Sequence, residues 1–102
     1  MTPKDNSQLD FDIDPIIHEP ARLKIITYLT LVESADFVFL ISRTGLSTGN
    51  FSTHMSKLQK AGYICIEKSI KDNRPHTMLS ITEPGKHAYQ NYRKVMQGIL
   101  GL

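Results

Sequence analysis

The sequence predicts an α+β fold, a winged helix-turn-helix that has a two- to three-stranded antiparallel wing and a C-terminal dimerisation helix. Three observations carry this prediction. Two segments with helical spacing are separated by a short link that contains a glycine, which is typical of a helix-turn-helix. Two segments rich in strand-forming residues then flank a polar, basic turn, which indicates a β-hairpin. A last helical segment with one apolar side follows the hairpin.

Three regions are expected along the 102 residues, which suffice for one domain with a small core. Residues 1–12 form a flexible or docked N-terminal arm, in which apolar residues alternate with aspartates. Residues 13–92 form the winged-helix domain, and residues 93–102 form the end of the C-terminal dimerisation helix. Neither a transmembrane segment nor an apolar signal core is evident, so we expect a cytoplasmic protein without membrane contact.

Two helices are predicted before the turn. The first covers residues 21–33 after Pro20, which suits the first helical position. The second covers residues 38–44 and ends at Gly45, where a left-handed conformation is needed. The inner face of the first helix is expected to hold apolar residues at helical spacing: Ile25, Ile26, Tyr28, Leu29 and Val32.

The third helix, residues 47–61, follows the turn directly. Ser47 is a good N-cap, and Gly62 is expected to end the helix. Its buried stripe is expected to consist of Phe51, Met55 and Leu58.

The wing is predicted from two strands, residues 63–66 and 77–81, which are joined by a basic link at residues 70–75. The link contains Asp and Asn, which tolerate turn geometry. Thr82 then caps the last helix, whose apolar side holds Tyr89, Tyr92, Met96 and Ile99.

The charges are distributed unevenly along the chain. Residues 1–40 carry three Lys or Arg against seven Asp or Glu, a net charge of −4. Residues 41–102 carry nine against three, a net charge of +6. Such an asymmetry is expected if the basic second part of the chain binds a polyanion such as DNA. A solvated charged surface explains it about equally well.

Four segments, residues 14–23, 46–55, 58–64 and 79–86, resemble in this order a family of small bacterial and archaeal winged-helix transcriptional regulators that are related to the MarR and ArsR groups. The resemblance implies a homodimer that binds double-stranded DNA. Each recognition helix, residues 47–61, would enter the major groove, and each wing would contact the backbone or the minor groove.

The side chains support this interpretation independently. The outward face of the third helix carries short hydrogen-bonding groups, among which Asn50 can pair with adenine. That face lacks arginine, the commonest reader of guanine, which argues against a G-rich site. The candidate DNA-binding residues are Arg43, Ser47, Thr48, Asn50, Ser52, Thr53, His54, Lys57, Lys71, Asn73 and Arg74.

Some of these residues have a second explanation. Ser47 is first of all a cap, and Arg43 favours the dipole at the end of its own helix. His54 either makes structural hydrogen bonds or contacts the DNA backbone, and the sequence leaves the two equally open.

The C-terminal helix is the expected dimer interface, because a chain of this size cannot bury its apolar end alone. The alternative is that the helix folds back onto its own subunit, against Ile25 and Leu29. The candidate interface residues are Tyr89, Tyr92, Val95, Met96 and Ile99.

No enzyme motif, metal-ligand spacing or cofactor loop is present in the sequence, and no small-molecule effector is evident. Cys65 is alone and is expected to be a small buried hydrophobe rather than a redox sensor. The competing function is a protein-interaction module without DNA contact, for which Tyr28, Phe37 and Phe39 are the candidate docking residues.

Overall fold

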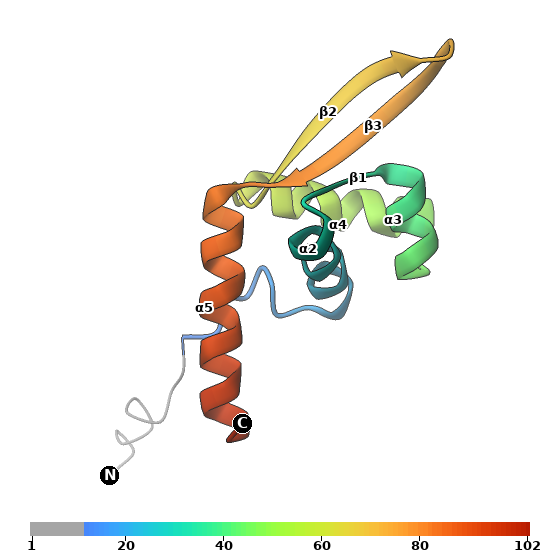
Figure 1. The fold of residues 1–102 in the computed structure, drawn as a ribbon. Coiled ribbons are helices and arrows are strands. Elements are labelled where there is room, and N and C mark those ends of the chain that lie inside the picture. Colours follow the sequence, from blue (N-terminus) through green and yellow to red (C-terminus); the bar gives the residue numbers. More distant parts are fainter. Residues whose placement is uncertain (1–11) are drawn as a thin grey trace.

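The computed structural model describes residues 12–102, which fold as a winged helix-turn-helix with a three-stranded antiparallel sheet (Figure 1). The predicted α+β fold is confirmed. Most of the predicted N-terminal arm, residues 1–11, lies outside the described residues. The helices are α2 (Pro20–Val32), α3 (Phe37–Thr44), α4 (Thr48–Lys60) and α5 (Glu83–Leu100), and the strands are β1 (Ser34–Asp36), β2 (Ile64–Lys71) and β3 (Arg74–Ile81).

The ends of α2 and α3 follow from local capping. The Glu19 carboxylate accepts a hydrogen bond from the backbone N–H of Arg22 at 2.8 Å, and Pro20 occupies the first turn of α2. Gly45 ends α3 with a φ of 73°, the left-handed conformation that favours glycine. Both predicted helices are confirmed to within one residue. Val32, expected on the inner face, is instead 45% exposed, because α2 ends there.

The sheet has the order β1-β3-β2, so β3 lies in the middle. Strand β1, which the sequence analysis did not predict, pairs antiparallel with β3 and places Ala35 opposite Leu79. Three residues are too few to carry an alternating pattern. Ala35 is nevertheless buried, because its strand bridges α2 and α3 over the core.

The wing strands are longer than predicted. Pairing continues to Lys71 opposite Arg74, so only Asp72 and Asn73 form the turn. Both have positive φ, 53° and 62°, as a two-residue type I′ hairpin turn requires. The predicted hairpin is therefore present, but its link is shorter than residues 70–75, because this turn matches the strand twist and lets pairing reach the tip.

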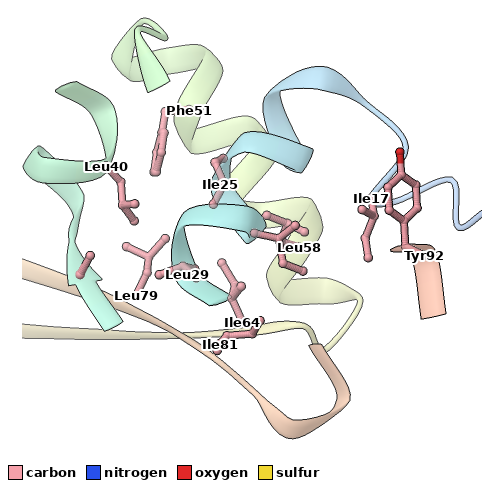
Figure 2. Packing of buried hydrophobic residues seen from close by; sticks show 12 residues of the cluster. Ile17, Ile25, Leu29, Leu40, Phe51, Leu58, Ile64, Leu79, Ile81 and Tyr92 are labelled. Atoms are coloured by element: carbon pink, nitrogen blue, oxygen red, sulfur yellow. The ribbon is translucent and has the colours of Figure 1, made fainter. Parts of the chain in front are cut away.

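The core is one apolar cluster between α2, α4 and the sheet (Figure 2). Phe51 and Leu58 of α4 are fully buried as predicted, whereas Met55 is only partly buried at the edge of the cluster. Ile17 and the Tyr92 ring lie together where the cluster reaches α5 (Figure 2). The largest fully buried side chains are those of Ile17, Ile25, Ile26, Leu29, Leu40, Phe51, Leu58 and Leu79.

Helix α5 begins at its predicted cap and runs away from the wing (Figure 1). The Thr82 hydroxyl accepts from the N–H of Gly85 at 3.0 Å and donates to the Gly62 carbonyl at 2.6 Å. A Cβ on Gly85 would overlap the Tyr63 carbonyl, so glycine is required for this close approach.

Cys65 is exposed, and the expectation of a buried thiol is wrong. Side chains alternate along a strand, and the neighbouring Ile64 and Ile66 face the core. The Cys65 side chain therefore points to the opposite face.

Candidate nucleic-acid interface

Helix α4 presents one polar side to solvent, opposite the buried Phe51 and Leu58. The helix contains no Asp or Glu, so no carboxylate of its own would repel a polyanion there. Its exposed side carries polar and basic residues spaced three and four apart: Asn50, Thr53, Lys57 and Lys60.

The first turn of α4 is open to solvent. The Ser47 hydroxyl accepts from the N–H of Asn50 at 3.2 Å, which confirms the predicted cap. The Thr53 hydroxyl donates to the Gly49 carbonyl at 3.1 Å. Thr48 is exposed, whereas Ser52 is partly buried on the side of the helix. Within residues 12–102, no hydrogen bond engages the Asn50 side-chain amide, which leaves it available to a ligand.

His54 lies beside this surface with its ring largely covered. Its Nδ1 lies 2.9 Å from Nη1 of Arg22 and 3.7 Å from the Glu19 carboxylate. The structural hydrogen bond that the sequence left open is therefore present.

The last turn of α3, which precedes α4 along the chain, carries one cation. Arg43 is exposed, and its guanidinium lies 5.0 Å from the centre of the Phe39 ring. This contact restrains the side chain without neutralising its charge.

The wing tip is polar and exposed. Lys71 and Arg74 are opposite each other at the ends of the two strands, and Asn73 lies in the turn. Among the described residues, no carboxylate forms an ion pair with either cation. The wing therefore carries two cations at its extremity.

Three residues of this region were missed by the sequence analysis. Lys60 continues the exposed stripe of α4, and its spacing from Lys57 was a usable signal. Gly49 has open space where a Cβ would lie, so a ligand can approach the backbone closely. Lys68 faces Ser56 and Gln59 of α4 across a notch beside the wing, which only the folded hairpin reveals.

The predicted interface residues of α5 divide into two groups. Tyr92 is buried within the single chain, where its hydroxyl lies 3.0 Å from Nδ1 of His18, and its place in a dimer interface stays a prediction. Tyr89 is partly buried and accepts a hydrogen bond from Thr27 of α2 at 3.0 Å. The first half of α5 thus folds back as the alternative expected. Val95 and Met96 are partly buried, and Ile99 is exposed.

An open apolar groove of about 520 Å³ runs along the outer side of α2. Leu31, at one end of it, is 73% exposed. The groove is lined by Pro20, Leu23, Lys24, Thr27, Tyr28 and Leu31.

Two titrating groups near α4 are perturbed. Burial, followed by the hydrogen bond to Asp14, raises the pKa of Tyr63 to about 12. Burial also disfavours the charged form of Glu19. The hydrogen bond from the Arg22 backbone and the neighbouring His54 and Arg22 side chains outweigh this effect and lower its pKa.

The residues proposed for protein docking are largely used within the fold. Phe37 packs edge-on against Phe51, with ring centres 5.2 Å apart, and Phe39 lies under Arg43. Tyr28 lines the α2 groove.

Residues 12–102 contain neither a helix suited to span a membrane nor a cluster of side chains suited to hold a metal ion. No helix there combines the length and apolar character that crossing a bilayer requires. In the same residues, no three His, Cys, Asp or Glu side chains gather as a metal site needs.

The chain resembles known proteins over most of its length. A family model described as a winged helix DNA-binding domain matches residues 21–100. Uncharacterized protein MJ0432 of Methanocaldococcus jannaschii is 32% identical over 77 residues, which are 76% of this chain and 84% of that protein. The uncharacterized HTH-type transcriptional regulator YcgE of Bacillus subtilis is 28% identical over 96 residues, which are 85% of this chain and 62% of that protein.

Solved structures show the same likeness. A transcriptional regulator homologue from Pyrococcus horikoshii OT3 superposes with a TM-score of 0.80 at 27% identity, covering 84% of this chain and 85% of that one. More distant matches include MarR-type regulators at 15% and 17% identity, with which the chain shares the fold alone.

Proposed function

We propose that this chain, which belongs to the winged helix DNA-binding domain family and resembles the HTH-type transcriptional regulator YcgE, binds double-stranded DNA sequence-specifically as a homodimeric cytoplasmic regulator. In this proposal α4 enters the major groove, and the wing contacts the flanking backbone or minor groove.

The observation that carries the proposal is the exposed side of α4. It offers an unengaged amide at Asn50, a hydroxyl at Thr53 and the cations Lys57 and Lys60, without any carboxylate. Asn suits the paired donor and acceptor on adenine, and the two lysines suit phosphates. Arg43 on α3 and Lys71 and Arg74 at the wing tip add exposed cations.

The homodimer is supported by two apolar surfaces on one chain. The last turns of α5 extend beyond the other helices (Figure 1), and Leu100 there is 60% exposed. The α2 groove is apolar and open. We propose that α5 of each subunit covers the α2 groove of its partner across a two-fold axis, which would bury both surfaces at once.

Substitutions can distinguish residues that contact base edges from residues that contact backbone phosphates, and they therefore test the proposed mode of DNA binding. Asn50→Ala is expected to lose about 1–3 kcal/mol on a duplex selected from random sequences and to relax selectivity at one base pair. Arg74→Ala or Lys71→Ala is expected to weaken binding to selected and scrambled duplexes alike and to flatten the salt slope by about one unit per contact. The measurement is a fluorescence titration of both duplexes at several salt concentrations.

The outcomes identify which assignment fails. If Asn50→Ala weakens both duplexes equally, Asn50 contacts only the backbone and the reading side of α4 is wrongly assigned. If Arg74→Ala leaves the salt slope unchanged, the wing does not contact DNA, and the protein-interaction module becomes the better hypothesis.

A further inference from the structure

Arg22 of α2 connects three parts of the molecule through its guanidinium. Nη1 donates to Nδ1 of His54 in the middle of α4, at 2.9 Å. Nε donates to the carbonyl of Ile16, and Nη2 lies 3.5 Å from the carbonyl of Pro15. The planar fork of arginine suits such divergent contacts, which lysine cannot reproduce.

The segment that contacts Arg22, residues 14–16, is also fixed near the C-terminal end of α4. The Tyr63 hydroxyl, just beyond α4, donates to the Asp14 carboxylate. The other oxygen of Asp14 accepts from the N–H of Ile16 at 2.8 Å. Residues 14–16 are therefore tied to α4 at its middle, through Arg22, and at its end.

The contact with Arg22 also constrains the tautomer of His54. A guanidinium has donors only, so Nδ1 accepts in this hydrogen bond, and the tautomer that can form it carries its proton on Nε2. The hydrogen bond is directional, whereas the apolar packing of Phe51 and Leu58 beneath α4 is not. The hydrogen bond is thus suited to fixing the rotation of α4 about its own axis.

His54 lies one turn after Asn50 on the same helix, so the rotation fixed there also determines where the Asn50 amide points. A hydrogen bond to a base edge weakens steeply with misalignment. We infer that Arg22 is a positioning residue for DNA binding, which sets the orientation of the recognition helix through His54. This inference rests on the proposed function.

The test compares variants that keep or remove this one contact. Arg22→Lys keeps the charge but loses the fork, His54→Ala removes the acceptor, and His54→Asn keeps an acceptor at the place of Nδ1. Arg93→Lys, at an exposed position of α5, is the matched control. Each variant is titrated with the selected and the scrambled duplex at a temperature at which circular dichroism shows it folded.

Arg22→Lys and His54→Ala are each expected to weaken the selected duplex about tenfold and to leave the scrambled duplex nearly unchanged, because phosphate attraction is retained. The double variant should be no weaker than the weaker single variant, since both act through one contact. His54→Asn and Arg93→Lys should bind like the wild type.

Equal losses on both duplexes, or wild-type binding by Arg22→Lys, would overturn the inference while leaving the proposed function intact. Losses that multiply in the double variant would likewise overturn it, because His54 would then act by contacting DNA independently. A wild-type chain that binds neither duplex overturns the proposed function, and the inference with it.

Discussion

Tyr63 occupies the junction between α4, the wing and α5. Its hydroxyl donates to Asp14, and its carbonyl accepts from the N–H of Thr82 at 3.0 Å. The same carbonyl lies against Gly85. One residue thus joins the N-terminal segment to the start of the last helix.

The raised pKa of Tyr63 predicts a loss of stability in alkali. The neutral hydroxyl is favoured in the folded state, so its stabilisation is complete below the usual tyrosine pKa of about 10 and is lost as the pH rises through about 12. Urea unfolding between pH 8 and 12 should show a steeper fall in the free energy of unfolding for the wild type than for Tyr63→Phe. At pH 8 the variant should be less stable by about 1–2 kcal/mol.

Tyr28→Phe is the control, because no hydrogen bond of the Tyr28 hydroxyl occurs in the described part of the chain. Parallel pH curves for Tyr63→Phe and the wild type would show that the hydroxyl of Tyr63 is not the source of the alkaline loss.

At the scale of single residues, sequence patterns predicted caps better than side-chain partners. Ser47, Gly45 and Thr82 act over three or four residues, so the local sequence contains the information needed. The partner of His54 lies 32 residues away, and that of Tyr92 lies 74 residues away. Such pairs form only when the chain folds, so the sequence left the role of His54 open and did not predict the partner of Tyr92.

At the scale of elements, α4 and α5 were predictable because each has a cap and a long apolar stripe. Strand β1 was not, since its three residues depend on pairing with β3 rather than on their own pattern. The β-hairpin of the wing was predicted correctly, but its strands are longer than predicted. The conformation of the turn determines how far the strands pair.

The conformation of the wing turn predicts how substitutions of Asn73 change the free energy of unfolding. At its positive φ, Asn73→Gly should leave the free energy of unfolding unchanged or raise it, whereas Asn73→Val should lower it by about 1–2 kcal/mol. Thermal or urea unfolding measures both. DNA titration of the Asn73→Gly variant then decides whether the amide is a contact: retained affinity assigns Asn73 to the turn alone, and lost affinity assigns it to DNA.

At the scale of the whole molecule, the resemblance to winged-helix transcriptional regulators is confirmed by the family match, and the fold is shared with MarR-family structures. The relation to ArsR proteins stays a prediction. The oligomeric state was the property that sequence patterns predicted least well, because the apolar end of α5 does not identify the surface that packs against it.

The proposed dimer predicts that Ile99→Glu converts the protein to a monomer. A carboxylate placed in the proposed α5 interface would be desolvated on association, which is costly. Sedimentation at micromolar concentration measures the change. Val38→Gln is the control, because Val38 is 74% exposed on α3, away from α5. A wild-type protein that sediments as a monomer would contradict the dimer.

The central claim, that the polar side of α4 and the wing bind duplex DNA, is tested most directly by the salt dependence of the wild-type affinity. The selected duplex is titrated at about 50 mM and 200 mM salt. If a dimer uses Lys57, Lys71 and Arg74 of both subunits, the affinity should fall by about 10³-fold or more, because each phosphate contact releases counterions. Binding that does not respond to salt, or no binding at either concentration, would contradict the account.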